Sequence, residues 1–248
     1  MAALYDTIGK AYADYRRPDP RIAAAICKAL GEARTIMNIG AGTGSYEPAD
    51  RDVVAVELSE TMIRQRPRNA APVVQASALQ LPFADDAFQT SLVSFTIHHR
   101  PDQLRGLREM ARVALRAVIF TWEPTSPNSW LMRDYFPEIF RHDLKALPPV
   151  SELYPKAFGH IEVLPVPIPH DCIDGFLECY WRRPEMYFDA GARAAISPFA
   201  KGIANTEAGL ARLRKDLDDG TWHRRNGHLD RKSTRLNSSH GYISYAVF

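Results

Sequence analysis

The first half of the chain alternates short apolar runs with segments of helical periodicity. Ile22, Ile26 and Leu30 recur every four residues and predict an amphipathic helix that ends at Gly31. Residues 101–115 predict a second such helix. Apolar runs outside these helices predict five strands: RTIMNIG, VVAVE, PVVQA, FQTSLVSFTI and RAVIFTW. Strands buried on both faces that alternate with helices predict an α/β fold with a doubly wound, mostly parallel sheet, which binds its ligands at the carboxyl ends of the strands.

The pattern changes after Trp122. The stretch HIEVLPVPIPHDC predicts an extended segment around 161–168, and its three prolines favour a position at an edge of the sheet. Residues 173–219 read as helical and predict a cap over the carboxyl ends of the strands. The expected organisation is an N-terminal segment with the first helix (1–30), a Rossmann-like core (31–124) and a helical cap (125–229).

Residues 230–248 do not resemble the rest of the chain. Asp230–His240 and Ile243–Phe248 resemble the translation, in one reading frame, of a common sequencing adapter, with a sample index between them. We therefore expect a non-native tail and the loss of the native last strand. A natural Ser/Arg-rich tail is the alternative. Because GYISYAVF has the composition of a strand, Tyr242–Val247 is expected to be able to dock where a last strand would lie.

Composition narrows the class of protein. The 46% hydrophobic and 24% charged residues are ordinary for a globular protein, and a net charge of +2 predicts no nucleic-acid partner. No segment has the apolar length of a membrane span or the pattern of a signal peptide. The three cysteines lack metal-ligand spacing, so no metal is expected and a reducing cytoplasm fits best.

A glycine-rich turn follows the first predicted strand. Glycines at such a place let the backbone turn sharply and let a ligand approach closely. The spacing Gly40-x-Gly42-x-Gly44 departs from the dinucleotide pattern, because Ser45 stands where its third glycine would be. A phosphate-binding loop would also need a lysine that is absent here. The turn alone indicates either a nucleotide site or an ordinary tight turn.

Glu57 ends the second predicted strand. A carboxylate at this place can accept hydrogen bonds from both hydroxyls of a ribose. An exposed acid with no ligand is the alternative interpretation.

Four motifs in this order resemble class I S-adenosylmethionine (SAM)-dependent methyltransferases of the ubiquinone/menaquinone-biosynthesis-like group: NIGAGTG, VVAVELSETMI, VVQASALQLPFADDAFQTSLVSFTIHH and REMARVAL with AVIFTW. The resemblance covers residues 1–124 and implies a SAM-binding core with a small-molecule acceptor. It also implies that the N-terminal segment covers the cofactor. The expected cofactor-binding residues are Arg16, Asn38, Gly40, Ala41, Gly42, Gly44, Glu57, Leu58, Met62, Ser77, Ala78, Leu79 and Thr96.

The resemblance gives most of these residues a role. The glycine turn lies under the methionine moiety, Glu57 holds the ribose, and Arg16 pairs with the cofactor's carboxylate. Leu58 and Met62 pack against the adenine, whose edge meets Ser77, Ala78 and Leu79, and Thr96 closes the pocket beneath the sulfonium. The family usually has an acid where Asn38, Ser77 and Gln89 stand here, and these changes remove charge from the expected site.

Methyl transfer is an in-line displacement that depends on alignment and on exclusion of water. His98 and His99 follow the fourth strand and are the expected catalytic residues, since a base would assist a phenol, enol or carboxylate acceptor. A pair that only shapes the pocket is the alternative. Two other classes remain to be compared: a catalytically degenerate SAM-fold binding or regulatory protein, and an NAD-linked dehydrogenase, whose Tyr-x-x-x-Lys pair is missing from residues 90–130. The acceptor and the oligomeric state stay open.

Overall fold

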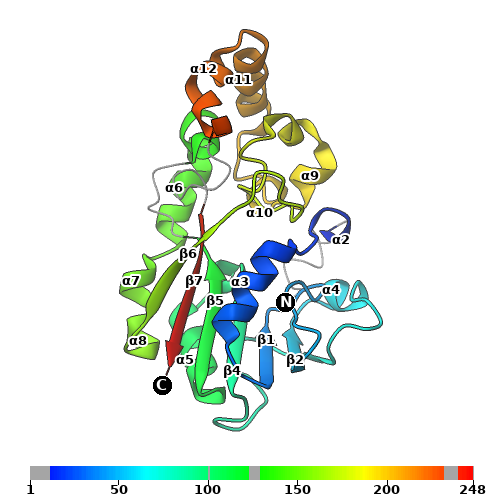
Figure 1. Ribbon diagram of the computed structural model, residues 1–248, viewed down its shortest axis with the longest axis vertical. Helices are drawn as coiled ribbons and strands as arrows, with labels where there is room; N and C mark the ends of the chain where they lie inside the picture. The colour runs from blue at the N-terminus through cyan, green and yellow to red at the C-terminus, as the bar shows by residue number, and fades with distance from the viewer. Residues whose placement is uncertain (1–11, 100, 123–128, 232–239, 248) are drawn as a thin grey trace.

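The computed structural model describes residues 12–99, 101–122, 129–231 and 240–247. Its centre is a seven-stranded sheet with the order β3-β2-β1-β4-β5-β7-β6 (Figure 1). The first five strands pair in parallel. They are β1 (Thr35–Ile39), β2 (Asp52–Glu57), β3 (Val73–Gln75), β4 (Thr90–Ser94) and β5 (Arg116–Thr121). The predicted doubly wound, mostly parallel sheet is confirmed.

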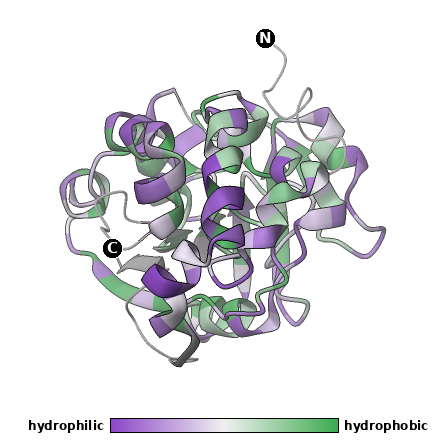
Figure 2. Cartoon of the chain, turned by 90° about the horizontal axis from the view of Figure 1, so that it is seen from above, coloured by the Kyte–Doolittle hydropathy of each residue, from purple (hydrophilic) through white to green (hydrophobic). Residues whose placement is uncertain are grey.

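Helices cover both faces of this sheet. The core helices are α2 (Tyr12–Tyr15), α3 (Pro20–Leu30), α4 (Glu60–Arg64), the short η1 (Ile97–His99) and α5 (Gln103–Val113). The two long amphipathic helices expected from the sequence are α3 and α5. Hydrophilic and hydrophobic positions both occur along the helices in Figure 2.

Neighbouring residues of each strand contribute to opposite faces. Ile36 packs into a cluster that contains the apolar side of α3, whereas Met37 packs into a second cluster with α5. Val118 and Ile119 of β5 divide in the same way. This alternation follows from the two-residue period of a strand, and it requires apolar side chains on both sides.

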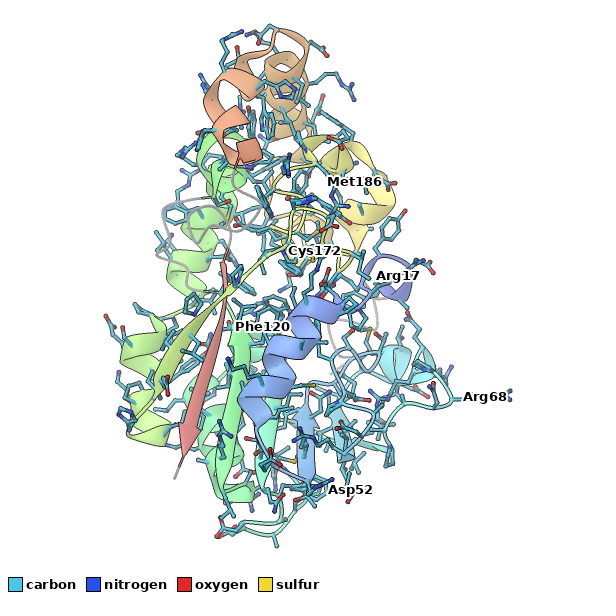
Figure 3. The ribbon with its side chains drawn as sticks, in the orientation of Figure 1. Arg17, Asp52, Arg68, Phe120, Cys172 and Met186 are labelled. Carbon is cyan, nitrogen blue, oxygen red and sulfur yellow. The ribbon has the colours of Figure 1, made fainter. Side chains whose placement is uncertain are left out.

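The cap shares its core with the sheet. Its helical segments are η2 (Leu131–Tyr135), α6 (Pro137–Ala146), α7 (Val150–Leu153), α8 (Pro155–Phe158), η3 (Pro184–Phe188), α9 (Ala190–Ala194), α10 (Ser197–Ala200), α11 (Thr206–Asp218), α12 (Thr221–Asn226) and η4 (Gly227–Arg231). Phe120 of β5 and Cys172 of the cap belong to one buried cluster, and both lie near the middle of the molecule (Figure 3). This part of the cap therefore packs on the α3 side of the sheet, whereas α7 and α8 pack into the cluster that contains α5.

Part of the cap differs from the expectation. Residues 173–219 were expected to be helical in three pieces, of which DGFLECYWRRPEMYF was the first, but residues 175–182 contain no helix and only η3 follows them before α9. The aromatic side chains of Tyr180, Trp181 and Tyr187 are buried here, and their packing stabilises these turns. Burial of large side chains has overridden the helical pattern.

The two remaining strands complete the sheet. β6 (Glu162–Pro167) lies at the edge, as the prolines predicted. β7 (His240–Val247) lies antiparallel between β5 and β6, with Arg116 opposite Val247 and Glu162 opposite Tyr245. The prediction that Tyr242–Val247 can dock at the place of a last strand is confirmed.

Asp19 links the start of α3 to the cap. Its fully buried carboxylate caps the helix by accepting from the Arg21 backbone N–H at 3.0 Å, and it accepts from the backbone N–H of Ile173 at 3.2 Å. The guanidinium of Arg21 donates to both carboxylate oxygens, at 3.0 and 2.8 Å. These bonds lower the pKa of Asp19 to about 2.

Replacement of Asp19 tests this link. We expect Asp19→Ala to lower the free energy of unfolding by about 2 kcal/mol, because it removes a helix cap and a buried acceptor. Asp19→Asn is the matched control, since it keeps a capping oxygen but loses the charge. The charge of Asp19 contributes its full stabilisation above the pKa of this group in the unfolded chain, which is about 4. This contribution is lost as the pH falls toward the folded-state pKa of about 2. The stability difference between wild type and Asp19→Asn, measured by urea unfolding, should therefore shrink between pH 6 and pH 3. A difference that stays constant would contradict the assignment.

Candidate functional site

A cavity of about 360 Å³ lies where the carboxyl ends of the parallel strands meet the cap. This size is typical of small-molecule sites. The sheet contributes the residues that follow its strands, and the cap contributes Ser129, Met132, Ile168, Phe176, Ile196 and Pro198, among others. The cavity is thus at the edge where a doubly wound sheet binds ligands.

Close contact shapes the glycine turn at one wall of this cavity. Gly40 has a φ of +70°, and a Cβ added to it would lie 2.6 Å from Oγ1 of Thr96. The N–H groups of Gly40 and Ala41 both donate to the Val56 carbonyl of β2, at 2.8 and 3.0 Å. Only glycine combines this backbone angle with this approach, so Gly40 and Thr96 determine each other's position.

Glu57 presents a carboxylate that backbone amides hold in place. Oε2 accepts from Gly42 N–H at 2.8 Å, and Oε1 accepts from the N–H groups of Leu58 and Ser59, each at 2.8 Å. Three fixed donors orient the carboxylate at the end of β2, and each carboxylate oxygen has lone pairs to spare. The remaining lone pairs can accept from hydroxyls of a ligand.

The residues expected at the adenine line the cavity next to Glu57. They are Leu58, Met62, Ser77, Ala78 and Leu79. Leu58 is half exposed, whereas Met62 is buried. The Ser77 hydroxyl accepts from Leu79 N–H at 3.2 Å and so shapes the loop that leaves β3.

Gly44 is placed differently from the expectation. It does not line the cavity, although Asn38, Gly40, Ala41 and Gly42 do. A Cβ on Gly44 would lie 3.2 Å from Oε2 of Glu47. Gly44 leaves room behind the turn for a buried carboxylate, and its expected role in cofactor binding stays a prediction. Gln89, where the family has an acid, also lies outside the cavity and bonds the N–H groups that begin β1.

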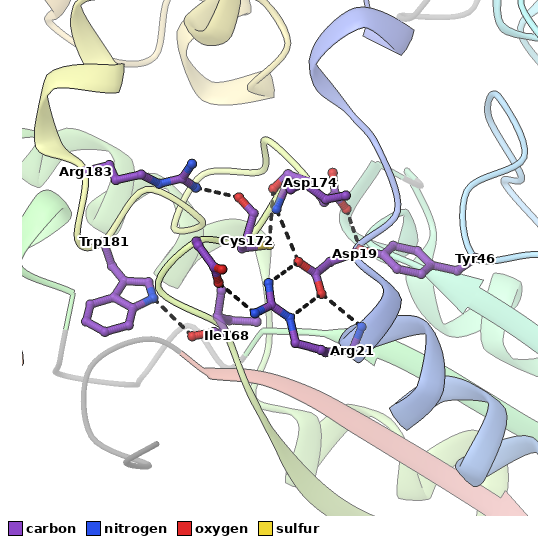
Figure 4. Close-up of polar contacts among 10 residues, drawn as sticks. Asp19, Arg21, Tyr46, Ile168, Cys172, Asp174, Trp181 and Arg183 are labelled. Atoms are coloured by element: carbon purple, nitrogen blue, oxygen red, sulfur yellow. Dashed lines mark hydrogen bonds and ion pairs between the residues drawn. The ribbon is translucent and has the colours of Figure 1, made fainter. Parts of the chain in front are cut away.

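Arg16 lines the cavity, but its Nε donates to Oδ1 of Asp174 in the cap at 2.6 Å. Tyr46, in the loop after β1, donates to the other oxygen of Asp174 at 2.7 Å (Figure 4). Sequence reasoning missed Asp174, because 158 residues separate it from Arg16 and no motif marks it. The part of the N-terminal segment before Tyr12 lies outside the described residues.

His98 and His99 lie together at the cavity, with ring centroids 3.8 Å apart. Burial lowers the pKa of His98 well below its usual value, and the nearby positive charges act in the same direction. The buried Nδ1 of His98 has no hydrogen-bond partner in the described part of the chain. His98 is therefore a neutral imidazole at neutral pH. Nδ1 of His99 lies 3.3 Å from the Lys201 ammonium.

Aromatic residues line the cavity between the histidines and the cap. The Phe95 ring lies 4.4 Å from Phe120, 4.9 Å from Phe176 and 5.7 Å from Trp122 between centroids. Phe95 has a φ of +55°, which is a strained angle for a side chain of this size. The sequence carries no signal for this angle, so the role of Phe95 could not be predicted.

The described residues also bear on two other kinds of site. No helix in them has the length and apolarity needed to cross a membrane. They also contain no group of three or more His, Cys, Asp or Glu that could hold a metal ion.

Comparison with known proteins gives consistent matches. A family model described as a methyltransferase domain matches residues 37–119. The solved structure of a putative methyltransferase from an antibiotic biosynthesis pathway of Anabaena variabilis has a TM-score of 0.83 and 31% identity, and the match covers 94% of this chain and 99% of that chain.

Two curated relatives match over shorter stretches. A demethylmenaquinone methyltransferase of Corynebacterium urealyticum is 35% identical over 88 residues, which are 34% of this chain and 38% of that protein. A ubiquinone/menaquinone biosynthesis C-methyltransferase of Geotalea uraniireducens is 28% identical over 152 residues, which are 54% of this chain and 62% of that protein. The chain thus spans about half the length of the curated relatives it matches. With a relative at 31% identity matched over almost its whole length, the chain belongs to the class I SAM-dependent methyltransferase family.

Proposed function

We propose that the protein transfers a methyl group from SAM to a small-molecule acceptor enclosed between the sheet and the cap. The observation that carries this proposal is one continuous cavity whose wall has two different parts. Glu57 and the glycine turn line one part of its wall, and His98 lines another part together with Phe95, Trp122 and the cap residue Phe176. A donor and an acceptor can thus meet inside a single enclosed space.

The residues around Glu57 fit the cofactor. The oriented carboxylate suits ribose hydroxyls, and Leu58 and Met62 offer apolar surface for an adenine. The glycine turn lets the amino-acid part of the cofactor approach the backbone. When bound, SAM supplies an electrophilic methyl group on its sulfonium.

The residues around His98 fit the chemistry of an acceptor with an acidic proton. His98 is neutral, so its imidazole can take a proton from a phenol or enol as the new bond forms. Phe95, Trp122 and Phe176 exclude water and offer flat apolar surfaces. The curated relatives act in menaquinone and ubiquinone biosynthesis, which supports a flat, hydroxylated ring as the acceptor. The cytoplasmic location expected from the sequence stays a prediction.

Glu57→Gln tests the cofactor part of the wall. We expect SAM affinity to fall by about tenfold or more, because the charge-assisted acceptor is lost and the new amide opposes the backbone donors. Isothermal titration calorimetry with SAM and its demethylated product measures the change. Glu60→Gln is the matched control, since Glu60 is an exposed acid on α4 that pairs with Arg64 at the surface and does not line the cavity. An unchanged affinity in Glu57→Gln would contradict the ribose role, and no heat with the wild type would reject SAM binding.

His98→Gln tests the acceptor part of the wall. With an acceptor found by screening hydroxylated aromatic compounds by mass spectrometry, we expect the rate of methyl transfer to fall about 100-fold. SAM affinity should stay the same. His160→Gln is the control, because His160 is exposed and does not line the cavity. A wild-type rate in His98→Gln would show that this ring only shapes the pocket.

The pH dependence gives an independent test of the same group. Because burial holds the pKa of His98 below the ordinary value of about 6.5, the neutral base persists as the pH falls through the neutral range. The single-turnover rate should therefore stay level from pH 8 to about 6.5. A rate that already falls above pH 7 would contradict a neutral His98 as the base.

A further inference from the structure

Two charged side chains are buried directly behind the glycine turn. The side chains of Arg66 and Glu47 are only 4% and 8% exposed. Nη2 of Arg66 donates to both oxygens of Glu47, at 2.8 and 2.9 Å, and to the Ala71 carbonyl at 2.9 Å. Glu47 also accepts from Ala71 N–H at 3.2 Å. Charges this deeply buried are tolerated only when they are paired and hydrogen-bonded in this way.

This pair contacts the turn itself. Nη1 of Arg66 donates to the Gly42 carbonyl at 3.2 Å. Gly44 is the residue that leaves space for both charged groups, since a Cβ there would lie 3.2 Å from Glu47 and 3.4 Å from Arg66. Neither Glu47 nor Arg66 lines the cavity. The pair therefore acts on a ligand only through the residues of the turn and of β1.

Asn38 connects the pair to the cavity. Its Nδ2 donates to Oε1 of Glu47 at 3.1 Å, and its side chain is buried at the wall of the cavity. A carboxylate can only accept, so Glu47 determines which end of the amide faces it. The amide nitrogen must be turned away from the ligand, which leaves Oδ1 as the group of Asn38 that is available to the cavity. No hydrogen bond to Oδ1 occurs within the described residues.

We propose that Glu47, held by Arg66, is a positioning residue that makes Asn38 a hydrogen-bond acceptor for the ammonium group of the cofactor's amino-acid part. This inference rests on the proposed binding of SAM. It accounts for an amide at a position where the family usually has an acid. A carboxylate at position 38 would stand about 3 Å from Glu47, and two like charges at this separation do not both stay ionised.

Glu47→Gln is the informative variant because it can reverse the direction of the hydrogen bond between residues 38 and 47 while the side chain at position 47 keeps its size and shape. The new side-chain amide can keep an oxygen toward Arg66 and then offers an N–H toward Asn38. Asn38 must turn its oxygen to meet that donor, so its Nδ2 would face the cavity and oppose an ammonium. We expect the affinity for S-adenosylhomocysteine to fall about tenfold, the value for loss of one hydrogen bond to a charged group.

The comparison ligand is 5′-methylthioadenosine, which keeps the nucleoside and the sulfur but lacks the amino-acid part. Its affinity should be unchanged in Glu47→Gln, since no ammonium is present to sense Asn38. A merely structural role of Glu47 would weaken both ligands together. Calorimetry with each ligand therefore separates positioning from general damage to the turn.

Restoring an acceptor at position 38 provides the rescue. In Asn38→Asp combined with Glu47→Gln, one carboxylate oxygen at position 38 accepts from the new amide and the other faces the cavity. We expect this double variant to bind S-adenosylhomocysteine within about threefold of the wild type, or more tightly. Its melting temperature without ligand should also exceed that of Glu47→Gln, which leaves the buried Arg66 charge without a carboxylate. Glu60→Gln is again the matched control and should match the wild type with both ligands.

The outcomes distinguish this inference from the proposed function. If the wild type binds neither ligand, the SAM assignment fails and the inference fails with it. If the wild type binds both ligands, and Glu47→Gln either binds both as tightly as the wild type or weakens both equally, only the inference is overturned. Selective loss of S-adenosylhomocysteine affinity with rescue in the double variant supports it.

Discussion

The carboxylate of Asp174 ties together the three parts of the chain that surround the cavity. It belongs to the cap, and it accepts from Arg16 of the N-terminal segment and from Tyr46 of the loop after β1. A carboxylate that is 1% exposed is stable only with such partners, so the segments that carry them must assemble together. Asp19 repeats this arrangement nearby, where its carboxylate joins α3 to Ile173 of the cap (Figure 4). The cover of the cavity is therefore positioned by buried charge as well as by apolar packing.

Two further carboxylates beside the glycine turn face in opposite directions. Glu57 receives three backbone donors and turns its remaining acceptor capacity to the cavity. Glu47 faces away from the cavity and satisfies Arg66 and Asn38 behind the turn. Between them, the close approach of Gly40 to Thr96 joins the turn to the end of β4. A ligand thus meets a surface whose polar groups are already oriented, which reduces the cost of binding.

Periodicity predicted the sheet well because burial on both faces leaves a direct mark on each strand. The prolines of β6 marked an edge, since they cannot donate to a neighbouring strand. Candidate site residues such as Glu57 and His98 both line the cavity because they follow strands, and parallel strands bring their carboxyl ends to one place. Residues 175–182 were predicted less well, because buried aromatic side chains decide their turns and a helical pattern does not reveal this.

The sequence by itself determined the α/β class, the order of the strand-end motifs and the family to which they belong, because each of these depends on local pattern or on short spacing. Tertiary structure alone decided the partners of the polar groups: Asp174 for Arg16, Glu47 for Asn38, and the space behind Gly44. These partners lie 9 to 158 residues apart in the chain, and the hydrogen bonds between them exist only after the segments that carry them have packed together. The sequence could name several residues of the cavity wall, such as Glu57 and His98, whereas the fold decided which of their atoms are available to the cavity.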